Sequence, residues 1–214
     1  MSIDGTTVEN GSERGFCTSC GNPRWYGSVV GLMRIYVALL RGINVSGKKT
    51  VPMPELKKLF IDAGYTSIST YINSGNVVFK SEKSDPDAIR QILEERIEAK
   101  FGFEVKVIVI ELAELVSCLA QCPFKERSLG AGEQIYLTFL SKPPSRQAVG
   151  AIENRKGDSD EHVLRGKVVY LLVKNGYSNT SLNNKFLEKK LCVDSTTRNI
   201  NTLRKISEIG DESE

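Results

Sequence analysis

The sequence is poor in the residues on which metal centres and nucleophilic triads most often depend. Its 214 residues include one histidine, His162, which stands beside Asp160 and Glu161. A single histidine excludes multi-histidine metal centres, and any Ser-His or Cys-His nucleophile would have to use this one residue. An isolated histidine in an acidic turn is more often solvated than catalytic. We therefore predict a metal-independent protein that needs no cofactor.

Long apolar runs and a charge excess of one sign are also missing. No apolar stretch approaches the roughly 20 residues that span a bilayer, so no membrane contact is predicted. The 29 Lys and Arg against 26 Asp and Glu leave a formal charge of only +3. This balance does not by itself indicate a nucleic-acid-binding protein, although it permits local basic patches. Five cysteines, an odd number, and a start without a signal peptide's apolar core predict a cytoplasmic protein.

Residues 1–32 differ in composition from the rest of the chain. They are polar, rich in glycine and without periodicity, so we expect a disordered or accessory leader. Its one feature is the pair Cys17 and Cys20, which has the spacing of half a structural zinc site, and Cys118 and Cys122 could in principle supply two further thiolates. Neither the spacing nor the intervening length resembles a zinc ribbon. Reduced thiols are the preferred interpretation.

From residue 33 onward the hydrophobic pattern is regular and predicts an α+β fold of two similar units packed together. Strands and helices are expected in the order β-α-β-β-α-β, the ferredoxin-like plan. The predicted organisation is a first unit at 33–111, a helical connector at 112–132 and a second unit at 133–214 with a closing C-terminal helix. Expected strands lie at 35–40, 67–73, 76–80, 104–110, 134–140, 161–165, 167–173 and 192–196. Expected helices begin at Pro54 and Pro86 and lie at 147–155, 181–191 and 199–209.

The loop after the first strand, Gly42-Ile-Asn-Val-Ser-Gly-Lys-Lys49, is close to a phosphate-binding P-loop. A lysine stands where the hydroxyl that holds magnesium is needed, and Pro52 and Pro54 delay the following helix, so nucleotide hydrolysis is not predicted. A Gly-rich, basic loop can still hold an anion with its backbone N–H groups and lysines. The alternative is that the glycines only permit the turn.

Two further motifs accompany this loop. The segment Asn73-Ser-Gly-Asn76 has the composition of a hairpin turn and needs no other explanation. In a β-α-β-β-α-β sheet, however, the turn between the second and third strands lies at the same end as the exit of the first strand, at Arg41. The polar groups of the two loops should therefore converge, as a binding site requires. The third motif, Ser195 to Thr202, either caps the last helix or binds an anion at its N-terminus beside Arg198.

These motifs together resemble a known family. The segments that carry the resemblance are Met33 to Val45, Val51 to Met53, Tyr71 to Phe79 and Thr196 to Thr202. They are similar to an uncharacterised, mostly bacterial family that is catalogued as domain of unknown function 1697, and the resemblance covers about residues 33–209. It implies two ferredoxin-like α+β units packed together. It implies no activity, substrate or catalytic residue.

We predict from these observations a binding protein for a phosphate-bearing ligand, which is either a nucleotide-like small molecule or a single strand of nucleic acid. The arginines would supply bidentate charge, and the Asn and Ser side chains would supply directional hydrogen bonds. The predicted ligand-binding residues are Arg41, Asn44, Lys48, Asn73, Ser74, Asn76, Arg198 and Asn199. Tyr36 and Phe79 are the only candidates for base stacking on the central strands.

Two alternatives stand beside this prediction. One is an enzyme of unknown reaction that uses no metal, although no carboxylate pair accompanies the motif loops. The other is an interaction module without a small ligand, in which the motifs only form turns and caps. Arg41 shows the same ambiguity: its planar fork either grips a ligand anion or ties down the carbonyls of the 73–76 turn.

Overall fold

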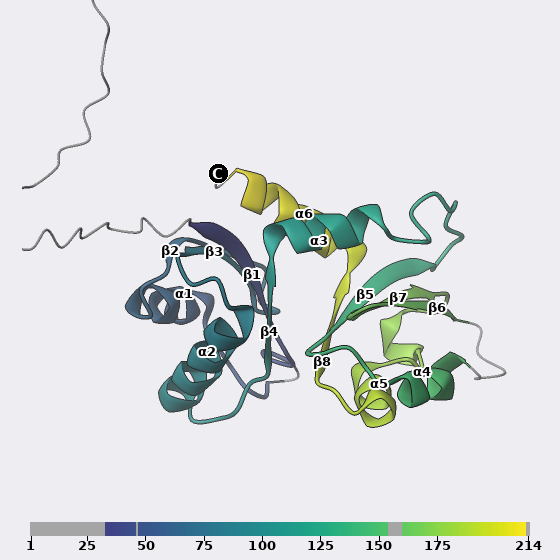
Figure 1. The fold of residues 1–214 in the computed structure, drawn as a ribbon, viewed down its shortest axis with the longest axis horizontal. Coiled ribbons are helices and arrows are strands. Elements are labelled where there is room, and N and C mark those ends of the chain that lie inside the picture. Colours follow the sequence, from purple (N-terminus) through teal and green to yellow (C-terminus); the bar gives the residue numbers. More distant parts are fainter. Residues whose placement is uncertain (1–32, 46, 154–159, 213–214) are drawn as a thin grey trace, which may run out of the picture. The chain divides into compact units, whose positions relative to one another are not determined.

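Each half of the described chain folds around a four-stranded antiparallel sheet (Figure 1). The structure, a computed structural model, describes residues 33–45, 47–153 and 160–212. The predicted leader, with Cys17 and Cys20, lies outside these residues. No helix in the described ranges is long and apolar enough to cross a membrane.

The first sheet has the strand order β2-β3-β1-β4. Its elements are β1 (Arg34–Leu40), α1 (Met53–Asp62), β2 (Thr66–Tyr71), β3 (Asn76–Ser81), α2 (Pro86–Phe101) and β4 (Val107–Glu111). The ends of α2 follow directly from the sequence. Asp85 Oδ1 accepts a hydrogen bond from the Asp87 N–H at 2.9 Å, and Gly102 ends the helix in the left-handed conformation.

The second sheet repeats this order as β6-β7-β5-β8. Its elements are β5 (Gln134–Leu140), α4 (Arg146–Glu153), β6 (Glu161–Arg165), β7 (Val168–Val173), a 3₁₀ turn η1 (Tyr177–Asn179), α5 (Asn184–Leu191) and β8 (Ser195–Asn199). A further helix follows the last strand of each sheet: α3 (Leu112–Ala120) follows β4, and α6 (Ile200–Asp211) follows β8. The prediction of two ferredoxin-like units with a closing C-terminal helix is confirmed.

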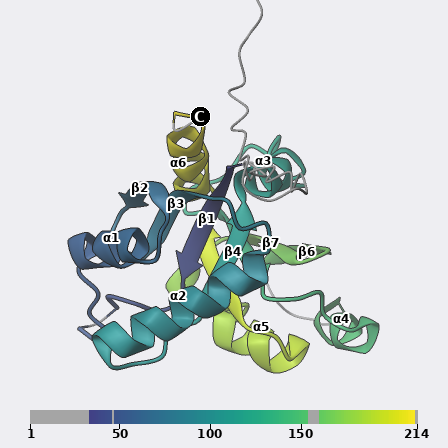
Figure 2. The same cartoon turned by 60° about the vertical axis from the view of Figure 1, so that its left-hand side comes forward.

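Three hydrophobic cores result from this arrangement. Helices α1 and α2 cover one face of the first sheet, and α4 and α5 cover one face of the second. The other faces of both sheets share a central core with α3 and α6, which lie side by side in Figures 1 and 2. The two helices pack closely at Gly210, where an added Cβ would stand 2.5 Å from Leu112 Cδ1.

The structure corrects two predictions about single elements. The last strand was predicted at 192–196 but spans Ser195–Asn199, so Arg198 lies in a strand and not at the start of the last helix. The prediction that Tyr36 and Phe79 could stack on bases is wrong. Both side chains are 0% exposed and stack on each other in the first core, with ring centroids 5.9 Å apart.

Candidate functional site

The loop between β1 and α1 is held in shape by Asn44. Its Nδ2 donates to the carbonyls of Val51 (2.9 Å) and Asn73 (2.8 Å), and its Oδ1 accepts from the Val51 N–H at 2.8 Å. The residue adopts φ +55, a left-handed conformation that asparagine tolerates better than most residues. Asn44 therefore joins the first motif loop to the 73–76 turn, as the topology argument predicted, but it does so with its whole side-chain amide.

The turn between β2 and β3 is packed against the end of β1. Gly75 has φ +75, and an added Cβ would stand 2.7 Å from both Leu40 Cβ and Ile43 Cδ1, so only glycine fits there. Asn76 is 0% exposed, and its Nδ2 donates to the Tyr71 carbonyl (3.0 Å) and to Ser74 Oγ (2.9 Å). Asn76 and Gly75 are therefore packed inside the fold and are not accessible to a ligand.

Arg198 connects the second unit to this turn. The side chain is on β8, the residue is only 9% exposed, and all five N–H groups of its guanidinium donate within the chain. The acceptors are Asn76 Oδ1 (2.5 Å from Nε), Thr196 Oγ1 (2.8 Å) and the Thr197 carbonyl (2.9 Å) at Nη1, and the carbonyls of Leu40 (2.6 Å) and Ser74 (3.0 Å) at Nη2. We call these residues the Arg198 network.

Burial lowers the pKa of Arg198 to about 10, which still leaves the guanidinium charged at neutral pH. No carboxylate of the described residues accepts from it, and its charge is stabilised by five neutral oxygen acceptors. The role that one interpretation gave to Arg41, tying down the carbonyls of the 73–76 turn, belongs to Arg198. Asn199 caps α6, because its Oδ1 accepts from the Asn201 N–H at 2.9 Å.

Arg41 forms an ion pair that the sequence did not reveal. Its Nη1 lies 2.5 Å from Glu188 Oε1 on α5, and the two side chains are 25% and 20% exposed. The same carboxylate oxygen accepts from the Ser195 N–H at 2.9 Å. Glu188 was missed because it lies 147 positions along the chain from Arg41, and no local pattern marks it.

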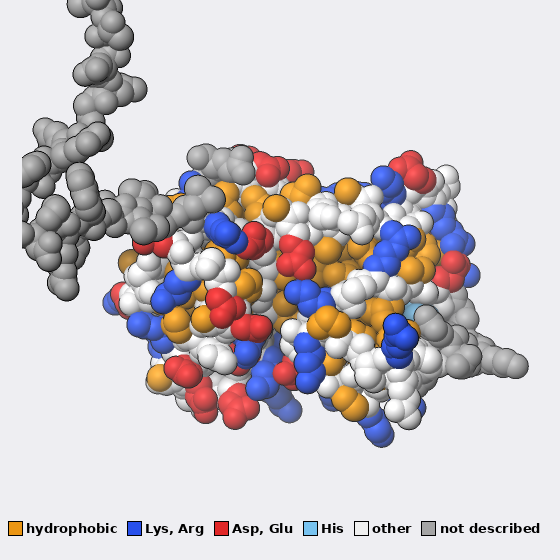
Figure 3. All heavy atoms as spheres, in the orientation of Figure 1, with side chains coloured by type: hydrophobic (Ala, Val, Ile, Leu, Met, Phe, Trp, Pro, Cys, Tyr) orange, Lys and Arg blue, Asp and Glu red, His pale blue; other side chains and the backbone are white. Residues whose placement is uncertain are grey.

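Exposed cations surround this closed network at the end of the first sheet. Lys48 and Lys49 are exposed on the β1–α1 loop, and Lys106 is exposed beside Arg41, whose N–H donates to its carbonyl at 2.8 Å. Lys185, one helical turn before Glu188 on α5, is also exposed. We call Arg41 and these four lysines the basic end. In Figure 3, Lys and Arg side chains gather along the lower middle of the surface, below β4 and β8.

Phe103 adds an aromatic ring to the basic end. It is partly exposed, Lys49 Nζ lies 6.0 Å from its ring centroid, and Lys49 also donates to the Glu104 carbonyl at 2.6 Å. The exposed Glu104 is the acidic side chain next to this ring. Asn73 is exposed on the neighbouring turn. Of the predicted ligand-binding residues, Arg41, Lys48 and Asn73 therefore present side chains at least partly to solvent, whereas Asn44, Asn76 and Arg198 hold the loops in place.

The described ranges contain no group of three or more His, Cys, Asp or Glu side chains that could hold a metal ion. His162 lies in β6, where it pairs with Leu171 of β7, far in sequence from the motif loops. Cys122 is buried and Cys118 half-buried, and burial raises the pKa of the Cys118 thiol.

Comparisons with known proteins place the fold and the family. No curated protein matches the chain. Among solved structures, it is similar to the conserved bacterial protein SP0830 from Streptococcus pneumoniae, with a TM-score of 0.65 and 24% identity over 83% of this chain and 98% of that one. At this identity the likeness concerns the fold alone. Residues 33–170 match the family described as "Protein of unknown function (DUF1697)". The chain therefore belongs to the DUF1697 family.

Proposed function

We propose that this protein is a metal-independent binding protein for a phosphate-bearing ligand, with single-stranded nucleic acid as the leading candidate, and that it acts in the cytoplasm. The observation that carries the proposal is the basic end itself. Three separate segments, the β1–α1 loop, the α2–β4 loop and α5, bring exposed cations to one place. Exposed lysines that are spread over several segments suit an extended polyanion better than a compact one.

The proposal assigns different roles to the residues of the motif loops. Lys48, Lys49 and Lys106 contact phosphate oxygens, and the Asn73 amide offers a directional hydrogen bond. Phe103 offers a ring on which one base can stack next to Lys49. The Arg198 network and Asn44 are positioning residues, because their hydrogen bonds fix the loops that carry the cations.

A nucleotide-like small molecule is the second ligand that fits the same cations. An interaction module without a small ligand is the second candidate function. It is favoured by one observation: the polar side chains of Asn44, Asn76 and Arg198 are all used inside the chain.

The test is fluorescence anisotropy of labelled single-stranded RNA and DNA 12-mers at 50 and 200 mM salt. Three phosphate contacts should lower the affinity by about tenfold or more between the two salt concentrations. The double variant Lys48→Glu/Lys49→Glu should abolish binding. The matched control is Lys125→Glu/Lys205→Glu, which changes the net charge by the same amount. Lys125 follows α3 and Lys205 lies on α6, at the opposite ends of the strands from the basic end. This control should bind nearly as well as the wild type.

Competition with unlabelled nucleoside triphosphate separates the two ligand classes. Displacement of RNA at micromolar nucleotide would favour the small molecule. The proposal is wrong if neither strand nor nucleotide binds at 50 mM salt, if binding does not depend on salt, or if the control variant loses as much affinity as the Lys48/Lys49 variant.

A further inference from the structure

The two sheets each end in an edge strand whose outward backbone groups can be identified from the register. The Arg41 N–H donates to the Lys106 carbonyl, so Ile108 and Ile110 also direct their N–H and C=O groups toward β1. Val107 and Val109 therefore direct theirs away from the sheet. In β8 the Ser141 N–H donates to the Asp194 carbonyl, and by the same alternation Ser195 and Thr197 face outward.

The edge of β8 is closed by side chains of its own surroundings. The outward N–H of Ser195 donates to Glu188 Oε1 at 2.9 Å, and the outward carbonyl of Thr197 accepts from Arg198 Nη1 at 2.9 Å. Side chains thus occupy one outward backbone group of each of these two residues, and they block the pairing of a further strand along this edge.

The edge of β4 is closed only at its first residue. The Val107 N–H donates to Glu94 Oε1 at 2.9 Å, the counterpart of the Ser195 bond. The residue that corresponds to Arg198 in the strand register is Ile110, which has no polar side chain to offer. Within the described part of the chain, the outward N–H and C=O of Val109 form no hydrogen bond.

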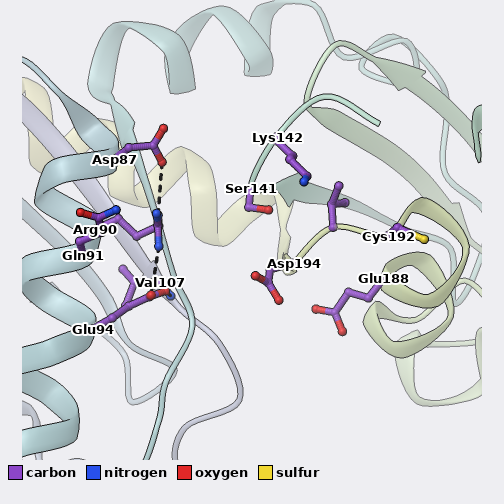
Figure 4. A pocket seen from close by; sticks show the side chains of 11 residues that line it. Asp87, Arg90, Gln91, Glu94, Val107, Ser141, Lys142, Glu188, Cys192 and Asp194 are labelled. Carbon is purple, nitrogen blue, oxygen red and sulfur yellow. Dashed lines mark hydrogen bonds and ion pairs between the residues drawn. The ribbon is translucent and has the colours of Figure 1, made fainter. Parts of the chain in front are cut away.

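A continuous hollow runs along this open edge. One part, of about 630 Å³, borders Val107, and a second part, of about 190 Å³, is lined by Ile108, Val109 and Ile110. The two parts share lining residues on α2 and after β5, so they adjoin. Figure 4 shows the larger part, with α2 on one side and Ser141, Lys142 and α5 on the other. This volume is in the range of sites that bind small ligands or short peptides.

The walls of the hollow indicate the chemistry of an occupant. On α2, Arg90 is shared between Asp87 (3.2 Å) and Glu94 (3.1 Å), which leaves one negative charge in excess. On the opposite wall, Asp194 and Lys142 form no ion pair with any described residue and offset each other, so the excess negative charge of the hollow is the one on α2. The second part has a mixed lining, to which Phe139 and Val168 contribute apolar side chains opposite α2.

We propose that the edge of β4 is a strand-addition site for an extended peptide segment of a partner protein, in which basic and apolar side chains alternate. The backbone of the segment pairs with Val109, as in other complexes that add a strand to a sheet edge. Its basic side chains face Asp87 on α2, and its apolar side chains, which alternate with them, face Phe139 and Val168 on the other side. Asp194 adds negative charge at the edge of the same hollow. This site adjoins the basic end at Glu188, which lines the hollow and pairs with Arg41, but the proposal does not depend on nucleic-acid binding.

The test uses the whole protein and a labelled acetyl-(Lys-Val)₃ peptide, with binding followed by anisotropy. The first control peptide is acetyl-(Glu-Val)₃, and the second carries N-methyl groups on alternate amides, which removes the backbone donors while keeping the side chains. The acetyl-(Lys-Val)₃ peptide should bind at least tenfold more tightly than either control. Equal binding of the N-methylated peptide would overturn the proposal, and so would an absence of binding.

Two further readouts address the protein side. Val109→Pro removes only an outward N–H, so the ladder with β1 keeps its bonds while peptide affinity should fall at least tenfold. Asp194→Lys should weaken binding severalfold, whereas the matched variant Asp62→Lys on α1 should not. In the wild-type protein, peptide should slow hydrogen exchange of the Val109 amide, while those of Ile108 and Ile110 are slow throughout. An unchanged Val109 amide in the peptide-bound protein would contradict strand addition even if Val109→Pro fails to fold.

Discussion

In both repeats a glutamate binds the backbone of the edge strand, but the arginine that pairs with this glutamate comes from a different place in each. In each, a glutamate from the second helix accepts a hydrogen bond from the first outward N–H of the last strand, at 2.9 Å in both: Glu94 for Val107 and Glu188 for Ser195. Both glutamate side chains are 20% exposed. Glu94 pairs with Arg90 of its own helix, whereas Glu188 pairs with Arg41 of the other unit. The ion pair of the first repeat therefore lies within one helix, whereas that of the second repeat connects the two repeats.

The next position along the strand extends the difference. Ile110 pairs with Val37, and its counterpart Arg198 pairs with Leu137. Where the first repeat places an apolar side chain, the second places a cation that takes three of its five acceptors from the first repeat. The two repeats have the same topology but different roles at their contact: the first supplies the hydrogen-bond acceptors, and the second supplies the donor, Arg198.

The largest expected effect comes from removing this donor. Arg198→Met keeps most of the volume but leaves the carbonyls of Leu40 and Ser74 and the Asn76 oxygen without their donor. We expect the free energy of unfolding to fall by about 3–5 kcal/mol, as for one partner lost from a buried charged network. Urea unfolding of the ligand-free protein measures it.

The matched control is Arg127→Met, whose side chain is 42% exposed and pairs with Glu161 on the surface. Its effect should stay within about 0.5 kcal/mol. If Arg198→Met costs no more than this control, the Arg198 network does not stabilise the fold, and Arg198 returns to the candidates for direct ligand contact.

The order of strands and helices could be predicted from the sequence because it depends on local signals. Asp85 and Pro86 start α2, Gly102 ends it, and short apolar runs mark central strands such as β1. The convergence of the first two motif loops also followed, because topology alone places the ends of β1 and the β2–β3 turn together. The hydrogen bond from Asn44 to the Asn73 carbonyl shows that the two loops are in contact.

The direction of the Arg198 side chain could not be predicted. The last strand was predicted three residues too early, and Arg198 stands directly before the N-cap of α6, a place where an arginine indicates anion binding. Three of its five acceptors lie 122 to 158 positions away in the sequence, and no local pattern indicates them. The same distance in sequence concealed Glu188.

The second prediction compares the two glutamates through their arginines. A double-mutant cycle with Arg41→Gln and Glu188→Gln keeps the acceptor for the Ser195 N–H and isolates the ion pair. Because this pair is half-buried and joins two units, we expect a coupling energy of about 1 kcal/mol in urea unfolding. The same cycle on Arg90 and Glu94, an i,i+4 pair within one helix, should give about 0.3–0.5 kcal/mol. Equal couplings would show that the connection between units adds nothing.

The third prediction concerns the hairpin turns of the two repeats. In the second repeat the turn residue with positive φ is Gly166 (+56). The turn of the first repeat has two such residues: Gly75 (+75) and Ile72 (+50), a β-branched residue that is 50% exposed. Ile72→Gly should raise the free energy of unfolding by about 1 kcal/mol because it removes backbone strain. Gly166→Ala should lower it by a similar amount, since nothing lies within 4 Å of the added Cβ and only the strain changes. Thermal melts that move in the same direction for both variants would contradict this explanation.

The last prediction concerns Tyr170 in the central core and the stability of the protein at high pH. Burial raises the pKa of Tyr170 to about 12, and its hydroxyl donates to the Cys118 carbonyl at 3.0 Å. In the unfolded chain this tyrosine ionises near pH 10, so between pH 10 and about 12 the unfolded state loses a proton that the folded state keeps. The unfolded state then binds fewer protons, and stability falls as pH rises through that window. Tyr170→Phe should lose about 1 kcal/mol at pH 7, through the missing hydrogen bond, but show a shallower decline from pH 10 to 12. Urea midpoints measured at pH 7, 10 and 11.5 for both proteins test this, and parallel declines would show that the central core does not hold the proton of Tyr170.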